Sequence, residues 1–193
     1  MPYILDICYP TKKGDSRVLV LEYKAVVKSS QAKLIDEAIR TSQFVRNKVL
    51  RYWMDNRGLG KKELYQYNTQ LRAEFDFVKD LNSHACQASV ENVERAINKF
   101  FDNCKKKKPG KKGYPRFKKN CLSVEYKQSG WKLNPSKRRI NFIDKKGIGE
   151  VKLLGKWDIH TYPVELIKRD RIVRRADGTC NFASRLITCN LAP

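Results

Sequence analysis

The chain has 193 residues, in which 41 lysines and arginines outnumber 20 aspartates and glutamates and leave a formal net charge of +21. Solubility requires far less charge than this, so the composition indicates a partner with dense negative charge. A chain of this length can bury about 70% of its unfolded surface. Its 8 Phe, 9 Tyr and 3 Trp argue against wholesale disorder. We therefore expect a folded, strongly cationic protein.

The sequence contains no recognisable membrane or secretion signal. Its most apolar early window, residues 18–21, is four residues long, whereas a membrane span needs about 20 apolar residues. Residues 1–6 lack the basic flank and apolar core of a secretory signal. We therefore expect a cytoplasmic protein, possible also on the nucleoid, with no membrane partner.

The spacing of cysteine and histidine predicts no metal centre. The 6 cysteines include no C-x-x-C pair, and the two histidines, His84 and His160, lie far apart in the sequence. In a reducing compartment such cysteines are mainly small buried side chains. We accordingly predict no metal and no cofactor.

In chain order, the pattern begins with a strand and continues with helices. Residues 17–28 are rich in β-branched and aromatic types and predict one strand, straight or kinked. Apolar residues at near-3.6 spacing then predict a long helix, which Ser29 or Ser30 can cap and which ends near Gly58. Two further helices are predicted over 62–76 and from about residue 82 to 104. Together they would form a three-helix bundle.

From residue 121 the pattern becomes strand-like. Short β-type runs alternate with Gly, Pro and Asn, which predicts a small antiparallel sheet or barrel. Because one strand precedes the helices and several follow them, we expect the helices to be inserted into the β-domain. The predicted class is α+β, and the predicted parts are residues 1–28 (N-terminal strands), 29–104 (helical insertion), 105–120 (basic loop) and 121–193 (the remainder of the β-domain).

The most informative segment for function is Lys105–Lys119, with nine basic residues and no acid in fifteen positions. Lysine clusters bind phosphates by releasing counterions, and rings among them can stack on bases. The alternative is a solvated loop whose two rings anchor it to the core. The predicted nucleic-acid contacts in this segment are Lys105, Lys106, Lys107, Lys108, Lys111, Lys112, Tyr114, Arg116, Phe117, Lys118 and Lys119.

A second basic group lies near residue 170, and a third candidate pair lies on the first helix. Neighbouring residues of a strand face opposite sides, so only part of the second group can line one groove. On the helix, Arg46 and Asn47 are predicted contacts, although a solvated helix face is an open alternative. The predicted contacts of the second group are Lys168, Arg169, Arg171, Arg174 and Arg175.

The sequence offers little support for catalysis. Two-metal phosphodiester cleavage needs acidic residues that converge on two cations. The carboxylates of the β-region all have basic neighbours, so ion pairing is the favoured interpretation and no catalytic residue is predicted. These carboxylates are Asp144, Glu150, Asp158, Glu165 and Asp170.

Several segments resemble the N-terminal part of the TnpB/OrfB proteins, which are transposon-encoded, RNA-guided DNA nucleases. They are Gln31, Phe44–Asn47 with Leu50, the helix that ends in Ala96–Phe101, and Gly113–Lys119. The G-Y-P-x-F-K run at Gly113–Lys118 is the most specific of them. Residues 167–178 resemble the strand pair that closes the family's β-domain, and the likeness covers about residues 21–178.

The resemblance implies a wedge-like β-barrel interrupted by a helical recognition domain, sometimes described as helix-turn-helix, that grips guide RNA and DNA. It also implies that the RNase H-like nuclease domain is absent, because that domain follows the β-domain in the family and the chain ends at Pro193. Residues 179–193 depart from the family pattern and are expected to form an atypical tail.

The function expected from this resemblance is binding of guide RNA or DNA by a catalytically inactive N-terminal portion of a TnpB/OrfB-like protein. Such a product could arise from a truncated gene. The alternatives are a regulator that binds transposon DNA or titrates guide RNA, and a generic RNA-binding protein.

Overall fold

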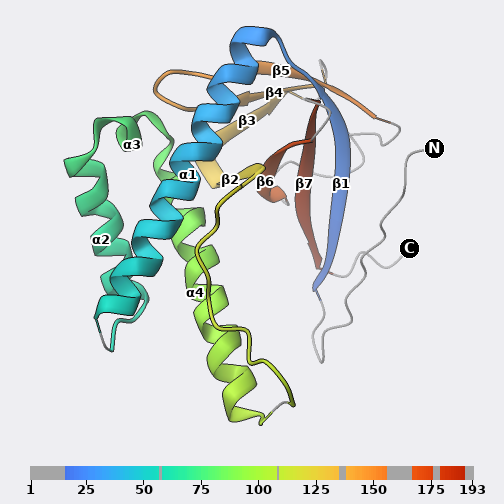
Figure 1. Ribbon diagram of the computed structural model, residues 1–193. Helices are drawn as coiled ribbons and strands as arrows, with labels where there is room; N and C mark the ends of the chain where they lie inside the picture. The colour runs from blue at the N-terminus through green and yellow to red at the C-terminus, as the bar shows by residue number, and fades with distance from the viewer. Residues whose placement is uncertain are drawn as a thin grey trace.

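The computed structural model describes residues 16–56, 58–107, 109–134, 138–155, 167–175 and 179–189, with the backbone alone at 16–19, 128, 168 and 181–189. This part of the chain forms an antiparallel sheet with α-helices beside it (Figure 1). The expected α+β class is therefore confirmed.

The sheet has seven strands in the order β2-β6-β7-β1-β5-β4-β3, and every neighbouring pair is antiparallel. Central β1 pairs with β7 along most of its length and with β5 at its C-terminal end. It buries Leu21, Tyr23 and Ala25 and exposes the residues between them, as a strand with one face on the core does. The strands are β1 (Ser16–Val26), β2 (Ser123–Lys127), β3 (Trp131–Asn134), β4 (Arg139–Phe142), β5 (Gly149–Leu154), β6 (Ile167–Arg174) and β7 (Cys180–Cys189).

The expected barrel is not closed in the part of the chain that the structure describes. β2 and β3 stand at the two ends of the strand order, and no backbone pairing joins them there. A short 3₁₀ turn, η1 (Gln128–Gly130), connects them directly. Closure needs a ladder of hydrogen bonds between the edge strands, and at this corner the chain bends from one edge to the other instead.

The C-terminal segment departs most from expectation. Instead of an atypical tail, residues Cys180–Cys189 form β7, which lies inside the sheet between β6 and β1. Its ladder with β1 runs from Cys189 opposite Ser16 to Cys180 opposite Ala25. A strand paired on both edges is held by its backbone, so it does not need the alternating pattern by which half-buried strands are recognised.

The helices follow β1 in the chain and precede β2, and they are α1 (Ser29–Asp55), α2 (Lys61–Glu74), α3 (Asp76–Asp80) and α4 (Ser83–Lys105). The three predicted helices are confirmed. The short α3 was not predicted, because five residues are too few to show a helical period. Phe75 separates it from α2 with an extended backbone, at φ −116° and ψ 114°.

Packing between α1 and α4 forms the core of the helical part. Val45 and Val49 of α1 and Val90 and Val93 of α4 are fully buried, and each pair recurs at helical spacing. Burial of one such side chain contributes about 1.5–3 kcal/mol. The C-terminal half of α4 extends away from the sheet (Figure 1), so the chain that follows it must travel back to reach β2.

The start of α1 differs from the prediction. Its N-cap is Lys28 rather than a serine, and the Lys28 amide donates to Oε1 of Gln31 at 3.0 Å. Nε2 of Gln31 donates in turn to the carbonyls of Ile148 and Glu150, both at 3.0 Å. Gln31 therefore closes the first turn of the helix and also ties the helix to β5.

Candidate nucleic-acid interface

The segment between α4 and β2, residues 106–122, contains no helix or strand among its described residues, and we call it the strap. It leaves α4 at Lys107, whose φ is 48°, and turns again at Gly110 and Gly113, with φ of 74° and 80°. These left-handed positions favour glycine and stop the helix from continuing. The strap then runs back alongside α4 to β2 (Figure 1).

Two amide side chains of α1 hold the backbone of the strap. Asn47 donates to the carbonyl of Lys118 at 2.8 Å and accepts from the Lys118 amide at 3.0 Å. Gln43 donates to the carbonyl of Lys119 at 2.9 Å and accepts from the amide of Cys121 at 2.7 Å. Each side-chain amide thus donates to and accepts from the backbone of the strap, as the backbone of a neighbouring strand would. The strap needs no neighbouring strand to fix its course here.

Arg46 supports the same segment from the next position of the helix. Its Nη1 donates to the carbonyl of Arg116 at 3.2 Å and to Oδ1 of Asn47 at 3.4 Å. Burial lowers the pKa of Arg46. Arg46 and Asn47 therefore position the strap, and their direct contact with nucleic acid stays a prediction.

The two predicted rings of the strap have different surroundings. Tyr114 packs edge-on against Phe100 of α4, with centroids 5.1 Å apart, and lies 6.1 Å from Trp53 of α1. Neighbouring Pro115 is buried. Phe117 is 46% exposed and contacts no other ring among the described residues. Tyr114 is itself 51% exposed, but its contacts with two rings anchor the strap, whereas Phe117 has no ring partner there.

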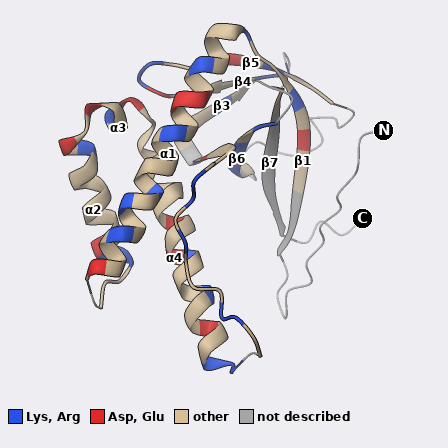
Figure 2. Cartoon of the chain, in the orientation of Figure 1, with Lys and Arg blue, Asp and Glu red and all other residues tan. Residues whose placement is uncertain are grey.

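The cations of the strap lie in solvent. Figure 2 shows Lys and Arg along the strap and at the end of α4. Seven of these cations form no ion pair among the described residues, and acids are absent from the strap sequence. Lys112 is half-buried, and its carbonyl accepts from Asn103 at 3.0 Å. Lys108 lies outside the described residues. The exposed cations are Lys105, Lys106, Lys107, Lys111, Arg116, Lys118 and Lys119.

The arginines of β6 face carboxylates instead. Glu125 of β2 is only 8% exposed and accepts hydrogen bonds from Arg169 and from Arg171, the latter at 2.8 Å. Glu91 of α4 accepts from Arg169 and from Lys127, the latter at 2.5 Å. These charges therefore join α4 to β2 and β6, and we call them the Glu91–Glu125 network.

Hydrogen bonding decides the protonation of this network. Burial by itself would raise the pKa of Glu91, but hydrogen bonds from Lys127, Tyr65 and Arg169 outweigh it and lower the pKa to about 2. Burial likewise opposes ionisation of Glu125, and the two arginines lower its pKa. The pKa of Tyr65 is raised by burial and by its bond to Glu91. Both carboxylates are therefore ionised at neutral pH.

Other residues of the second basic group also make contacts within the protein. Nε of Arg174 lies 3.4 Å from Oδ1 of Asp36 on α1, and the Arg175 amide donates to the Thr179 carbonyl at 2.8 Å. The side chain of Lys168 lies outside the described residues. The predicted second group thus takes part in internal contacts, and its binding of nucleic acid stays a prediction.

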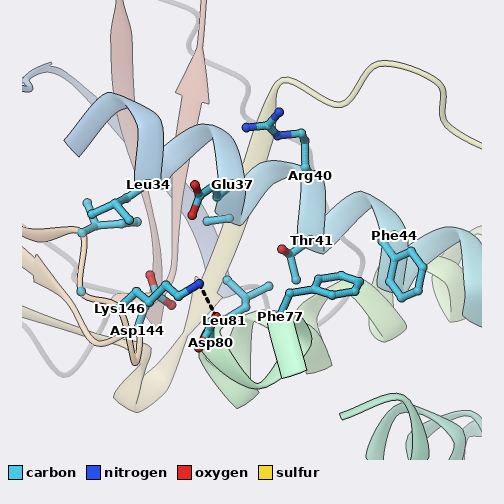
Figure 3. A pocket seen from close by; sticks show the side chains of 13 residues that line it. Leu34, Glu37, Arg40, Thr41, Phe44, Phe77, Asp80, Leu81, Asp144 and Lys146 are labelled. Atoms are coloured by element: carbon cyan, nitrogen blue, oxygen red, sulfur yellow. Dashed lines mark ion pairs between the residues drawn. The ribbon is translucent and has the colours of Figure 1, made fainter. Parts of the chain in front are cut away.

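A hollow lies beside α1 (Figure 3). Its volume is about 450 Å³, and apolar side chains of α1 and α3 line it with charged ones at the rim. The Lys146–Asp80 pair crosses that rim at 2.7 Å. Behind it, Asp144 accepts from Tyr126 at 2.7 Å and from the Asn82 amide at 2.9 Å. Burial raises the pKa of Asp144. Through its bonds to Tyr126 and Asn82, the Asp144 side chain ties the start of α4 to the sheet.

Two findings bear on other kinds of site, both limited to the described ranges. No group of three His, Cys, Asp or Glu side chains is placed there to hold a metal ion. None of the helices there is both long enough and apolar enough to cross a membrane. Among the cysteines described, Cys86 and Cys180 are buried, Cys121 is half-buried and Cys104 is exposed.

Sequence reasoning missed Gln43 and the two network carboxylates. Gln43 lies four residues before Asn47, so both amides share one face of α1, and this spacing is the one local signal for the strap's support. Glu91 and Glu125 carry no local signal, since their partners come from other elements.

Comparison with known proteins yields no family. No protein-family model matches this chain, and no curated protein sequence matches it at a significant level. The resemblance to TnpB/OrfB proteins rests on the quoted segments.

Proposed function

We propose that this protein binds nucleic acid through the strap. The observation that carries the proposal is a contrast in charge pairing. Arginines of β6 pair with carboxylates, whereas seven cations of the strap and of the end of α4 are exposed and without acid partners among the described residues. Phosphates supply the missing negative charge, and the released counterions drive binding. A backbone of evenly spaced phosphates matches an extended cationic segment.

The fixed backbone of the strap favours tight binding. Gln43 and Asn47 make four hydrogen bonds to it, and Tyr114 packs it against Phe100. A loop that is ordered before binding loses less conformational entropy when the ligand arrives. The lysine side chains still have to be ordered, but their backbone positions do not change.

The quoted resemblance supports the same site. Asn47 belongs to one resembling segment, Phe100 to the second and Gly113–Lys119 to the third, and each of the first two contacts the third. On this basis we propose that the chain is the guide-RNA- or DNA-binding portion of a TnpB/OrfB-like protein. A helix-turn-helix role of the inserted helices stays a prediction.

The test is a salt titration of binding to a labelled 30-nucleotide RNA and the matching DNA. We expect log Kd to change linearly with log salt, with a slope of about 0.7–0.9 for each phosphate contact. The variant Lys111→Gln/Arg116→Gln/Lys118→Gln/Lys119→Gln should lose about 3 units of slope and at least tenfold in affinity.

The control variant removes the same number of charges elsewhere. Lys24, Lys33, Lys62 and Lys132 are exposed and lie on β1, α1, α2 and β3. Their joint replacement by Gln should leave the slope within about 1 unit of the parent. Equal losses in the two variants would show that net charge, rather than the strap, governs binding.

A further inference from the structure

We propose that the hollow beneath the strap binds one unpaired base of a single-stranded nucleic acid, with Phe117 as the ring on which the base stacks. This inference rests on the proposed function and names the form of nucleic acid that the strap selects. It separates two tasks: the cations bind phosphates of any nucleic acid, and the hollow accepts a base only where that base is unstacked.

The hollow is large enough for this occupant. Its volume is about 850 Å³, and it is lined by Arg46, Ala96, Phe100 and residues 111–118 of the strap. Pockets for small molecules commonly measure about 300–1,000 Å³. Its wall therefore combines rings and an aliphatic surface with cations, which is the combination that a base with its attached phosphate requires.

The ring contacts of Tyr114 and Phe117 indicate which of the two is available for stacking. Tyr114 already contacts Phe100 and Trp53, so its packing fixes the strap. Both rings line the hollow and are about half exposed, Tyr114 at 51% and Phe117 at 46%, but Phe117 has no ring against it among the described residues. An exposed phenyl ring held on a fixed backbone gains apolar burial and π-stacking when a base covers it.

A duplex cannot use this ring in the same way. Bases inside a duplex are stacked on both faces, and proteins reach those faces only in single strands, loops and bulges. Arg116 and Lys118 precede and follow Phe117 in the sequence and are exposed, so the stacking position has a cation next to it in each direction along the strap. Phosphates on both sides of an unpaired base would meet these cations, whereas a duplex would meet the cations alone.

Arg46 gives the hollow a polar donor. It lines the hollow, and its bonds to the Arg116 carbonyl and to Asn47 both use Nη1. A guanidinium carries five N–H donors in a planar fork, which suits the acceptor edge of a base or a phosphate. The three hydrogens on Nε and Nη2 form no hydrogen bond to the described residues, so they can donate to a ligand.

The experiment compares one strand with its duplex, using the full chain. The probes are a 12-nucleotide RNA and a 12-nucleotide DNA with a central 2-aminopurine, each alone and paired with its complement. We expect quenching of 2-aminopurine fluorescence in the single strands, where the base stacks on a ring. Phe117→Ala should weaken single-strand binding about tenfold and abolish the quenching, while the salt slope and duplex binding stay unchanged.

Two variants control for folding and for general loss of an exposed ring. Phe117→Trp keeps a stacking surface and should restore binding. Phe77→Ala removes a ring that is 43% exposed but lies on α3, away from the strap, and it should leave both affinities unchanged. An abasic nucleotide at the probe position should reproduce the loss seen with Phe117→Ala, although the phosphate charge is the same.

The outcomes separate this inference from the proposed function. Equal weakening of single-strand and duplex binding by Phe117→Ala, or undiminished binding of the abasic strand, would overturn the base site and leave the phosphate site standing. Absence of salt-dependent binding to either form would overturn the proposed function. Quenching in the RNA or in the DNA, lost with Phe117→Ala, supports the base site in that strand.

Discussion

The strap and β6 are the two basic regions of this protein, and they use similar residues in opposite ways. On β6, Arg169 and Arg171 bind the carboxylates of Glu91 and Glu125 at the boundary between α4 and the sheet. On the strap, Lys111, Arg116, Lys118 and Lys119 are exposed and have no such partner among the described residues. The first region uses charge to join elements, and the second leaves it for a ligand.

The difference shows that basic composition alone does not mark a binding surface. What separates the regions is the location of acids, and those acids come from distant elements: Arg169 and Glu91 are 78 residues apart in the sequence. The strap has no acid within it and is held by neutral amides, which satisfy its backbone without neutralising its side chains.

The largest expected effect comes from breaking the network on the β6 side. Glu125→Ala should lower the free energy of unfolding by about 3 kcal/mol, because Arg171 would lose its carboxylate partner and partly buried Arg169 would keep only Glu91. Urea unfolding monitored by tryptophan fluorescence measures this. Glu150→Ala is the matched control: its pair with Arg139 is exposed, so the loss should stay below about 1 kcal/mol.

The pH dependence of stability tests the Glu91–Glu125 network a second way. The pKa of Glu91 is about 2 in the folded protein against an ordinary value of 4.5. Its stabilisation is therefore complete above pH 4.5 and is lost as the pH falls from there towards 2, by roughly 1.4 kcal/mol per pH unit. Glu91→Gln should make the free energy of unfolding depend less on pH across this window, and the pH dependence that Glu125 contributes should remain. An unchanged pH dependence would show that Glu91 is not ionised within the network.

Adding an acid to the strap should make it resemble β6. Asn120 is exposed and follows Lys118 and Lys119, so the carboxylate of Asn120→Glu can neutralise a neighbouring lysine. We expect affinity for a single-stranded 30-nucleotide probe to fall about three- to tenfold at low salt, with a smaller difference at high salt. Asn141→Glu makes the same charge change at an exposed position of β4. A loss of the same size there would contradict a local effect.

Loosening the strap without changing its charge should have the smallest effect. Asn47→Ala removes two hydrogen bonds to Lys118 and should cost about 1–2 kcal/mol of stability. The released strap should be cleaved faster by trypsin at Lys118 and Lys119, and nucleic acid should bind a few-fold more weakly. Gln66→Ala, at an exposed position of α2, serves as the control. Unaltered cleavage would mean that Gln43 and Tyr114 hold the strap by themselves.

The helices could be predicted because their signals are local. The apolar period of α1 and α4 and the cap at Asn82, whose Oδ1 accepts from the His84 amide at 2.8 Å, lie within single segments of sequence. The strand β7 could not, because its longest ladder is with β1, which comes from the other end of the described chain. The open sheet was mistaken for a barrel for a related reason, since closure depends on two edge strands that sequence patterns cannot pair.

The sequence by itself determined the large positive charge, the helical and strand-forming segments, and a basic tract free of acids with two rings in it. Only the tertiary structure decided which cations are neutralised, because ion pairs form between elements that the fold brings together, such as Glu91 with Arg169. It also decided that Asn47 supports the strap and that Tyr114, rather than Phe117, anchors it. Residue types give each side chain its chemistry, but whether that chemistry is used internally depends on neighbours that folding supplies.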